Sequence, residues 1–204
     1  MCVRFFIDTH SDELDEIVEK ARATKTGIKL SHLWGPVKDG EIRPTDIAPV
    51  IAPAPSGKPK IFAMKWGYSV PGKTTILFNA RSETAAIRPT FKEDWLHHRC
   101  IVPASYYYEW EHLTDEKGRK KSGSRYLIQP KGQDITYLCG LYRVEDGYPY
   151  FIILTREPGE EIRFIHNRMP LILPKEKIEE WTDPNSDPQR IIRCALTLMV
   201  ADRG

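Results

Sequence analysis

Residues 99–110 read RCIVPASYYYEW, and this stretch decides the fold class. Both of its halves, 99–102 and 106–110, are rich in β-branched and aromatic residues, which favour extended strands. Similar stretches recur between turn residues, at 3–7, 47–52, 61–66, 75–78, 126–129, 135–142, 148–155 and 194–200. Many short strands with few helices predict a β-rich α+β domain built around a bent sheet or a barrel-like core. We expect one domain over residues 1–204.

Helices are predicted at the periphery of this domain. Between residues 12 and 23, apolar side chains recur at helical spacing behind an acidic first turn, which is typical of an amphipathic surface helix. Shorter helical pieces are expected at 83–87, 91–97, 159–164 and 175–181. The polar run DEKGRKKSGSR, residues 115–125, is expected to form a solvated hairpin loop, with a phosphate-contacting loop as the alternative.

Composition indicates an ordinary globular protein. Hydrophobic residues make up 41% of the 204 positions and charged residues 28%. No apolar run approaches the ~20 residues that span a bilayer, and the first residues form no signal segment, so we expect a cytoplasmic protein. The net charge of only +2 means that a nucleic-acid partner would be held by a local basic patch. The sequence shows no obvious dimer seam, which favours a monomer.

The four cysteines, at positions 2, 100, 139 and 194, lie too far apart to form a CxxC pair. This spacing argues against a structural zinc site and indicates reduced thiols. The sequence also contains no cofactor fingerprint. We therefore predict neither a metal nor a cofactor.

Cys2 directly follows the initiator methionine, and this position makes an unusual chemistry available. Removal of Met1 would leave one residue with both a free α-amine and a thiol. An aldehyde can form an imine with that amine and then be trapped by the thiol as a five-membered thiazolidine. An α-amine titrates near ~7.7–8.0 and a thiol near ~8.5, so both suit neutral pH. The reaction requires an exposed aminothiol near its acid and base partners.

Two ionisable residues are candidates for those partners. Glu109 follows three tyrosines and precedes Trp110, a setting that favours its protonated form and proton transfer near neutral pH. The alternative places Glu109 on the solvent face of its strand. His166 lies in IHNRMP, where a histidine either shuttles protons at physiological pH or is buried and bonded to the backbone.

Asn79 and Arg81 flank Ala80 in the string FNARSET. On a strand, both side chains would point to the same face. An amide beside a guanidinium can hold an anionic, oxygen-rich ligand such as a sugar phosphate. The alternative is an internal network that holds loops together.

Five strings taken together resemble the SRAP family, the SOS-response-associated peptidase proteins that are also described as abasic-site processing proteins. They are MCVRF, KWGYSVPG, FNARSET, RCIVPASYYYEW and HNRMPLIL, and they keep the order of the family motifs from Cys2 to Leu173. The resemblance implies recognition of abasic sites in single-stranded DNA, where the opened sugar carries an aldehyde.

The resemblance also implies roles for the candidate catalytic residues. Cys2 would form the thiazolidine DNA–protein crosslink, and Glu109 would assist sugar ring opening and proton transfer. Asn79 would position the Cys2 amine or the sugar. His166 would assist proton transfer at the opened sugar and in reversal. Cleavage of the DNA by β-elimination from the imine is a plausible second output of the same site.

The DNA contacts implied by the resemblance involve three further residues. Arg4 and Arg81 match positions that hold the phosphates flanking the lesion, and Trp66 would offer a ring on which a base stacks. Val3 and Tyr106 stand where the family pattern has glycine, so they would narrow the site or shift the DNA path.

Two other classes of function are compatible with the sequence. An N-terminal cysteine near a histidine and an asparagine also resembles the N-terminal-nucleophile amidohydrolases, for which removal of Met1 would be a minimal peptidase act. A noncatalytic module that binds single-stranded DNA is the third reading. It predicts that Cys2→Ala leaves all DNA association unchanged.

Overall fold

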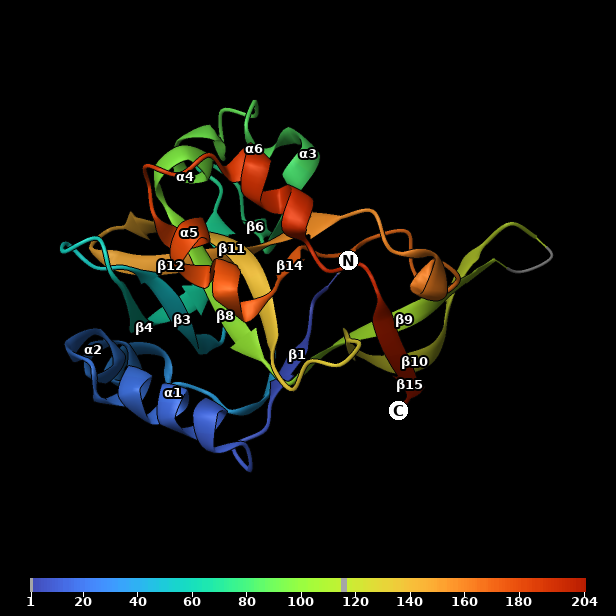
Figure 1. Cartoon of the computed structure of the whole chain (residues 1–204), viewed down its shortest axis with the longest axis horizontal. Helices are drawn as coiled ribbons and strands as arrows, with labels where there is room; N and C mark the ends of the chain where they lie inside the picture. Colours follow the sequence, from blue (N-terminus) through green and yellow to red (C-terminus); the bar gives the residue numbers. More distant parts are fainter. Residues whose placement is uncertain (1, 115–116) are drawn as a thin grey trace.

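The computed structural model describes residues 2–114 and 117–204, and a closed barrel forms its centre (Figure 1). Within the described part, β12 pairs with both β11 and β4, so the ring runs β12-β4-β3-β8-β11 and returns to β12. The pairing of β12 with β4 is parallel, and the other pairs around the ring are antiparallel. The barrel strands are β3 (Ile47–Pro53), β4 (Pro59–Trp66), β8 (Arg99–Ala104), β11 (Thr136–Glu145) and β12 (Tyr148–Arg156).

Shorter strands extend the barrel at its edges. The strand β7 (Asn79–Arg81) runs parallel to β12, while β13 (Met169–Pro170) and β14 (Ile172–Leu173) pair with β12 and β11. A separate pair is formed by β5 (Tyr68–Ser69) and β6 (Ile76–Leu77). These additions bring the FNARSET and HNRMPLIL strings to β12, which is their common neighbour.

A second, antiparallel sheet projects from the barrel (Figure 1). Its order is β15-β10-β9-β1-β2, with bounds β15 (Met199–Arg203), β10 (Lys120–Pro130), β9 (Tyr106–Thr114), β1 (Phe5–Ile7) and β2 (Gly40–Ile42). The run of residues 99–110 joins the two sheets, because β8 belongs to the barrel and β9 to the projecting sheet.

Ser105 forms the corner between β8 and β9, and three hydrogen bonds fix it. Its backbone N–H donates to Phe6 O at 2.8 Å, and its Oγ accepts from Asp8 N–H at 2.9 Å. The hydroxyl of Thr136 donates to Ser105 O at 2.9 Å. The first two bonds come from the β1 segment and the third from β11, so the corner is tied to both sheets.

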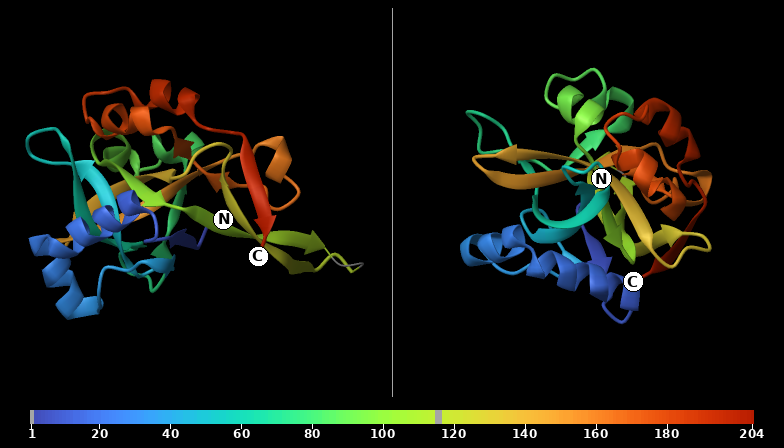
Figure 2. Two further views of the ribbon diagram at one scale, coloured as in Figure 1. Left: turned by 60° about the horizontal axis from the view of Figure 1, so that its bottom comes forward. Right: turned by 60° about the vertical axis from the view of Figure 1, so that its left-hand side comes forward.

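The helices cover opposite sides of the barrel (Figure 2). The pair α1 (Asp12–Ala23) and α2 (Lys25–Trp34) packs beside β3 and β4, and α1 buries Leu14, Ile17, Val18 and Ala21 as expected for its amphipathic pattern. The other helical segments are α3 (Ser82–Ala85), α4 (Lys92–His97), η1 (Glu160–Ile162), η2 (Lys175–Lys177), α5 (Ile178–Thr182), α6 (Pro188–Ile191) and η3 (Ile192–Cys194). No helix in the described residues is both long and apolar enough to cross a bilayer.

The predicted fold class, a β-rich α+β architecture with a barrel-like core, is confirmed, and some element assignments need correction. The segment predicted as a strand at 194–200 contains the end of η3 and extended chain before β15 begins at Met199. The helix predicted at 159–164 is the single 3-10 turn η1, and α2 and α6 were not expected. Strand β10 already begins at Lys120, so the hairpin loop is shorter than the predicted 115–125; residues 115 and 116 lie outside the described residues.

Arg99, the first residue of β8, is a fully buried cation that forms hydrogen bonds between the barrel and the segment 181–186. Its guanidinium donates to the carbonyl oxygens of Trp95 and Trp181 at 2.8 Å. Further acceptors are the carbonyl oxygens of Leu96, Asp183 and Ser186. The rigid, planar fork of arginine suits this array of acceptors, whereas the single ammonium of lysine does not.

We predict that Arg99→Met lowers the free energy of unfolding by ~3 kcal/mol or more, because several buried carbonyl groups lose their donor. Arg99→Lys should recover only part of this loss. Urea unfolding followed by circular dichroism measures both variants, with the exposed Arg88→Gln as the matched control. A loss of less than ~1 kcal/mol for Arg99→Met would show that these bonds contribute little to stability.

Candidate functional site

The first strand brings Cys2 against the FNARSET segment. Strand β1 lies between β2 and β9, and Tyr108 N–H donates to Arg4 O at 2.9 Å. The side-chain Nδ2 of Asn79, on β7, donates to Cys2 O at 2.8 Å. Asn79 Oδ1 is buried and has no hydrogen-bond partner among the described residues. The amide therefore holds the Cys2 carbonyl with one end and keeps an acceptor available at the other.

The expectation of an exposed aminothiol is wrong for the chain that begins with Met1. Cys2 is 0% exposed and belongs to the main hydrophobic core together with Phe5 and Tyr107. Burial, followed by the nearby Glu109 carboxyl, raises the pKa of the Cys2 thiol far above its ordinary value. The thiol is therefore held in its protonated form in this state.

Glu109 is buried on the inner face of β9. Tyr107 and Glu109 lie on the same face of the strand, and Glu109 is only 4% exposed. Burial raises the pKa of the Glu109 carboxyl above its ordinary value. This confirms the desolvated setting over the alternative of a solvent-facing carboxylate, and it provides a group able to give and take a proton.

His166 is a buried histidine bonded to the backbone, which was one of the two sequence-based alternatives. Its Nδ1 accepts the backbone N–H of Arg168 at 2.8 Å. A neutral imidazole that accepts at Nδ1 carries its hydrogen on Nε2. Burial, with a further contribution from His112, lowers the pKa of His166 to about 4. At neutral pH His166 is therefore an uncharged N–H donor, and the expectation of an imidazole that titrates at physiological pH is corrected.

His112, on β9, forms a histidine pair with His166. The two ring centroids lie 4.0 Å apart with an interplanar angle of 61°. The backbone N–H of His112 donates to Ile165 O at 2.9 Å, which ties the His166 segment to β9. His112 was not among the residues predicted from the sequence. Its position three residues after Glu109 is not informative without knowledge of the strand twist and of the loop that faces it.

One potential ligand atom from each of Glu109, His112 and His166 lies within 4.8 Å of the other two, close enough to consider a shared metal ion. The His166 hydrogen bond opposes this reading. A metal on Nε2 would need the lone pair there and would move the hydrogen to Nδ1, against the Arg168 N–H. The arrangement therefore suits proton chemistry better than metal chemistry.

These groups open onto a surface hollow of about 480 Å³. Its lining includes all three members of the Glu109, His112 and His166 cluster, and it contains Val3 but not Tyr106, which instead stacks on Phe6. Of the two positions where the family pattern has glycine, Val3 thus narrows this hollow. The full lining is Val3, Arg81, Glu109, Trp110, His112, Ser122, His166, Asn167 and Arg168.

The aromatic wall of the hollow is Trp110, whereas Trp66 belongs to the core. Trp66 is 0% exposed, donates its Nε1–H to Phe78 O at 2.9 Å and stacks against Phe151. The expectation that a base stacks on Trp66 is therefore wrong, because no ring surface is available. Trp110 is partly exposed, lines the hollow and carries Arg4 above its ring at 5.2 Å.

Cationic side chains surround the hollow. Arg81 is exposed on its rim, and Arg4 is partly exposed and paired with Glu41 at 2.8 Å. Arg168 donates through both terminal nitrogens to Glu83 at 2.8 Å, which links the HNRMPLIL string to FNARSET. The roles of Arg4 and Arg81 as phosphate contacts stay predictions, and Arg168 is an additional cation that sequence reasoning left unassigned.

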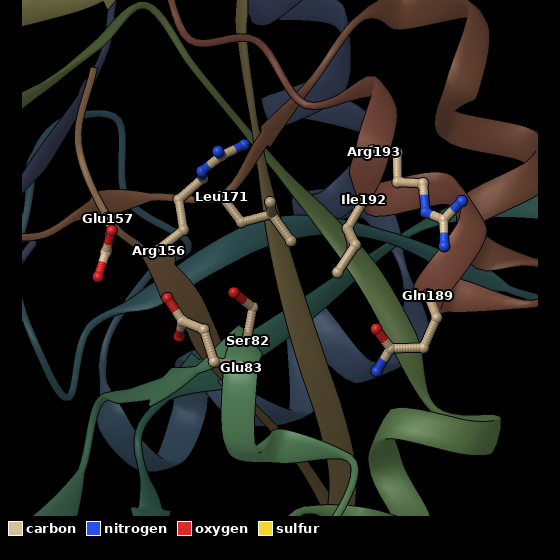
Figure 3. A pocket seen from close by; sticks show the side chains of 8 residues that line it. All are labelled: Ser82, Glu83, Arg156, Glu157, Leu171, Gln189, Ile192 and Arg193. Atoms are coloured by element: carbon tan, nitrogen blue, oxygen red, sulfur yellow. The ribbon is translucent and has the colours of Figure 1, made fainter. Parts of the chain in front are cut away.

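Two further hollows continue from the first. One of about 260 Å³ shares Arg81, Asn167 and Arg168 with it and adds Arg163. The next, of about 550 Å³, shares Glu157 with the second hollow, and Arg156 and Arg193 stand at its opposite sides (Figure 3). Arginines therefore recur along a track that leads away from the buried carboxyl and imidazoles.

The chain is similar to known proteins in sequence and in fold. A family model described as "SOS response associated peptidase (SRAP)" matches residues 1–201. The abasic site processing protein YoqW of Bacillus subtilis is 29% identical over 204 residues, covering 92% of this chain and 83% of that protein. The abasic site processing protein HMCES of Xenopus tropicalis is 26% identical over 171 residues, covering 68% of this chain and 51% of that protein.

Solved structures share the fold. A protein from Bacteroides thetaiotaomicron superposes with a TM-score of 0.71 at 21% identity, covering 99% of this chain and 91% of that one. A phage-related protein from Bordetella bronchiseptica also gives 0.71, at 23% identity, with 100% and 94% covered.

The burial pattern of the thiols gives a direct prediction. Cys2, Cys100 and Cys139 are buried and Cys194 is exposed. A water-soluble disulfide reagent should therefore titrate about one thiol in folded protein that retains Met1 and all four after denaturation. Cys194→Ser should reduce the folded value to near zero. Rapid labelling of Cys2 in that variant, located by peptide mass spectrometry, would contradict the burial described above.

Proposed function

The chain belongs to the SOS response associated peptidase (SRAP) family, and on this premise we propose that it processes abasic sites in single-stranded DNA by a covalent crosslink through Cys2. The observation that carries the proposal is the convergence of Cys2, Asn79, Glu109 and His166 from distant parts of the chain. A hydrogen bond joins Asn79 to Cys2, and another joins the β9 strand that carries Glu109 to the segment that carries His166. Glu109 and His166 line one hollow beside the exposed Arg81.

The reaction requires that Met1 be removed, because only then is the Cys2 nitrogen an amine. Because Cys2 is 0% exposed in the chain with Met1, the proposal also requires that this removal opens access from the hollow to the amine and the thiol. The amine adds to the aldehyde of the opened sugar, water leaves, and an imine remains. The thiol then adds across the imine, so that one C–N and one C–S bond replace the C=O bond. Asn79 Oδ1, a buried acceptor with no described partner, suits an N–H of this amine. Such a bond would fix the orientation of the nitrogen.

Glu109 and His166 divide the acid and base work in this proposal. The raised pKa of Glu109 favours a protonated carboxyl that can donate to the departing hydroxyl and recover a proton later. His166, fixed by Arg168 N–H, presents Nε2–H as a neutral donor to a sugar oxygen. A neutral donor of this kind can stabilise the sugar oxygen without itself having to lose or gain a proton.

DNA would be held by the cations and the ring at the rim. Arg81, Arg168 and Arg4 suit backbone phosphates, while Trp110 offers the stacking surface that Trp66 does not. In the adjoining hollows Arg163, Arg156 and Arg193 would contact phosphates of one flank of the strand, next to the carboxylates of Glu83 and Glu157 that line the same hollows. Because such contacts address the backbone, sequence preference should be slight and salt sensitivity marked.

The same imine permits strand cleavage by β-elimination, and closure of the thiazolidine ring would prevent it. The peptidase alternative receives less support. The raised pKa of the buried Cys2 thiol in the chain with Met1 weighs equally on a thiolate hydrolase and on sulfur addition to the imine. What favours the crosslink is the family, whose relatives are named abasic site processing proteins. The alternative of a noncatalytic DNA-binding module does not explain why Cys2, Asn79 and Glu109 lie close together.

We predict that Cys2→Ser abolishes the denaturation-resistant adduct with an oligonucleotide that contains one abasic site. Serine keeps the α-amine, so the imine forms but is not trapped as a sulfur ring, and strand cleavage should increase. Noncovalent affinity should stay within about twofold, because phosphate and stacking contacts are unchanged. Denaturing gels measure adduct and cleavage together, with Cys194→Ser as the control and mass spectrometry to confirm loss of Met1. No adduct with processed wild-type protein would refute the proposed function.

We predict that Glu109→Gln slows adduct formation by about 10²-fold, because the amide keeps the shape of the carboxyl but cannot transfer a proton. Single-turnover rates at saturating oligonucleotide measure the effect, and the dissociation constant should change little. The exposed Glu93→Gln is the matched control. A normal rate for Glu109→Gln would remove Glu109 from the chemistry.

A further inference from the structure

The proposed crosslinking reaction releases one proton that has to leave a buried site. At neutral pH the α-amine of processed Cys2 is largely an ammonium. One ammonium, one thiol and one aldehyde yield one thiazolidine, one water and one proton. Cys2 is 0% exposed and Glu109 4% exposed, so the groups nearest the reaction have little direct contact with solvent. Glu109 and His166 line the surface hollow, so an exposed proton carrier beside them can pass the proton between this site and bulk water.

We propose that His112 is the proton relay between the buried acid–base groups and solvent. This inference rests on the proposed function. His112 is exposed, whereas its partner His166 is only 6% exposed, and their ring centroids are 4.0 Å apart. Side-chain atoms of both imidazoles and of the Glu109 carboxyl lie within 4.8 Å of one another. The three groups therefore lead from the interior to the surface in one short chain.

The local backbone keeps this chain in place. His112 N–H donates to Ile165 O, so β9 and the His166 segment cannot separate without losing a hydrogen bond. The fixed tautomer of His166 directs an N–H, and not a lone pair, toward its surroundings. A proton released to Glu109 can then be exchanged through the exposed imidazole of His112, which can bind a proton on one nitrogen and release one from the other.

Charges around His112 favour outward transfer. Arg81 of β7 and Arg168 of the loop between η1 and β13 line the same hollow, and Ser122 of β10 faces His112 across the ladder as a neutral group. The acidic groups are Glu109 and Glu83, and Glu83 balances the charge of Arg168. The Arg81 guanidinium, which has no such partner among the described residues, disfavours an extra proton that stays in the hollow. A proton that reaches His112 is consequently released to water instead of being retained. His112 acts through Glu109 and His166 and does not itself touch the sugar.

The test compares His112→Gln and His112→Asn with wild type in single-turnover crosslinking across pH 5.5–8.5. Both variants should be about tenfold slower near neutral pH, a smaller effect than the 10²–10⁴-fold of a direct acid or base. The rates of the variants should rise with the concentration of imidazole buffer, whereas the wild-type rate should not. A purely structural role for His112 would not give this dependence on a small proton carrier.

The matched control is His97→Gln, which changes an exposed histidine on α4 away from the hollow and should behave as wild type. Oligonucleotide affinity and circular dichroism spectra of the variants should match those of wild type. Wild-type rates in both His112 variants, or slow rates that no concentration of imidazole raises, would overturn the relay. Failure of processed wild-type protein to form any adduct would instead refute the proposed function, so the two failures are distinguishable.

Discussion

The corner at Ser105 is the constraint on which the rest of the structure depends. The chain passes there from the barrel into the projecting sheet, and hydrogen bonds from the β1 segment and from β11 hold the turn. Glu109 lies four residues beyond this corner, while Asn79 and His166 are positioned by strands that adjoin β12 of the barrel. The distance between the carboxyl and its partners is therefore set by the angle at which one sheet leaves the other.

Burial has opposite effects on the two ionisable groups at the junction, and the effects are complementary. It raises the pKa of the Glu109 carboxyl and lowers that of the His166 imidazole, so both groups favour their uncharged forms. The interior of the hollow thus carries little charge of its own, while arginines occupy its rim. The arginines at the rim attract a polyanion such as DNA, while the uncharged Glu109 and His166 inside the hollow can exchange protons with a bound substrate.

Much of the fold follows from local sequence, and the residual errors have physical causes. The helix at Asp12–Ala23 and most strands were predictable because periodicity and β-branched content report directly on local structure. Trp66 was assigned to a base-stacking surface through the family resemblance, and a motif match does not reveal that the folded chain buries the ring completely. Cys2, Asn79, Glu109 and His166 could be selected from motifs, but His112 could not. Its partnership with His166 depends on a contact between segments more than fifty residues apart in sequence.

The anchoring of Arg99 has a consequence for how the sequence can change. Its acceptors at Trp95, Leu96, Trp181, Asp183 and Ser186 are all main-chain oxygens, which every amino acid supplies. No partner side chain has to mutate together with the guanidinium for these bonds to persist. Correlated substitutions across an alignment would therefore leave this interaction undetected, although it joins the C-terminal segment to the barrel.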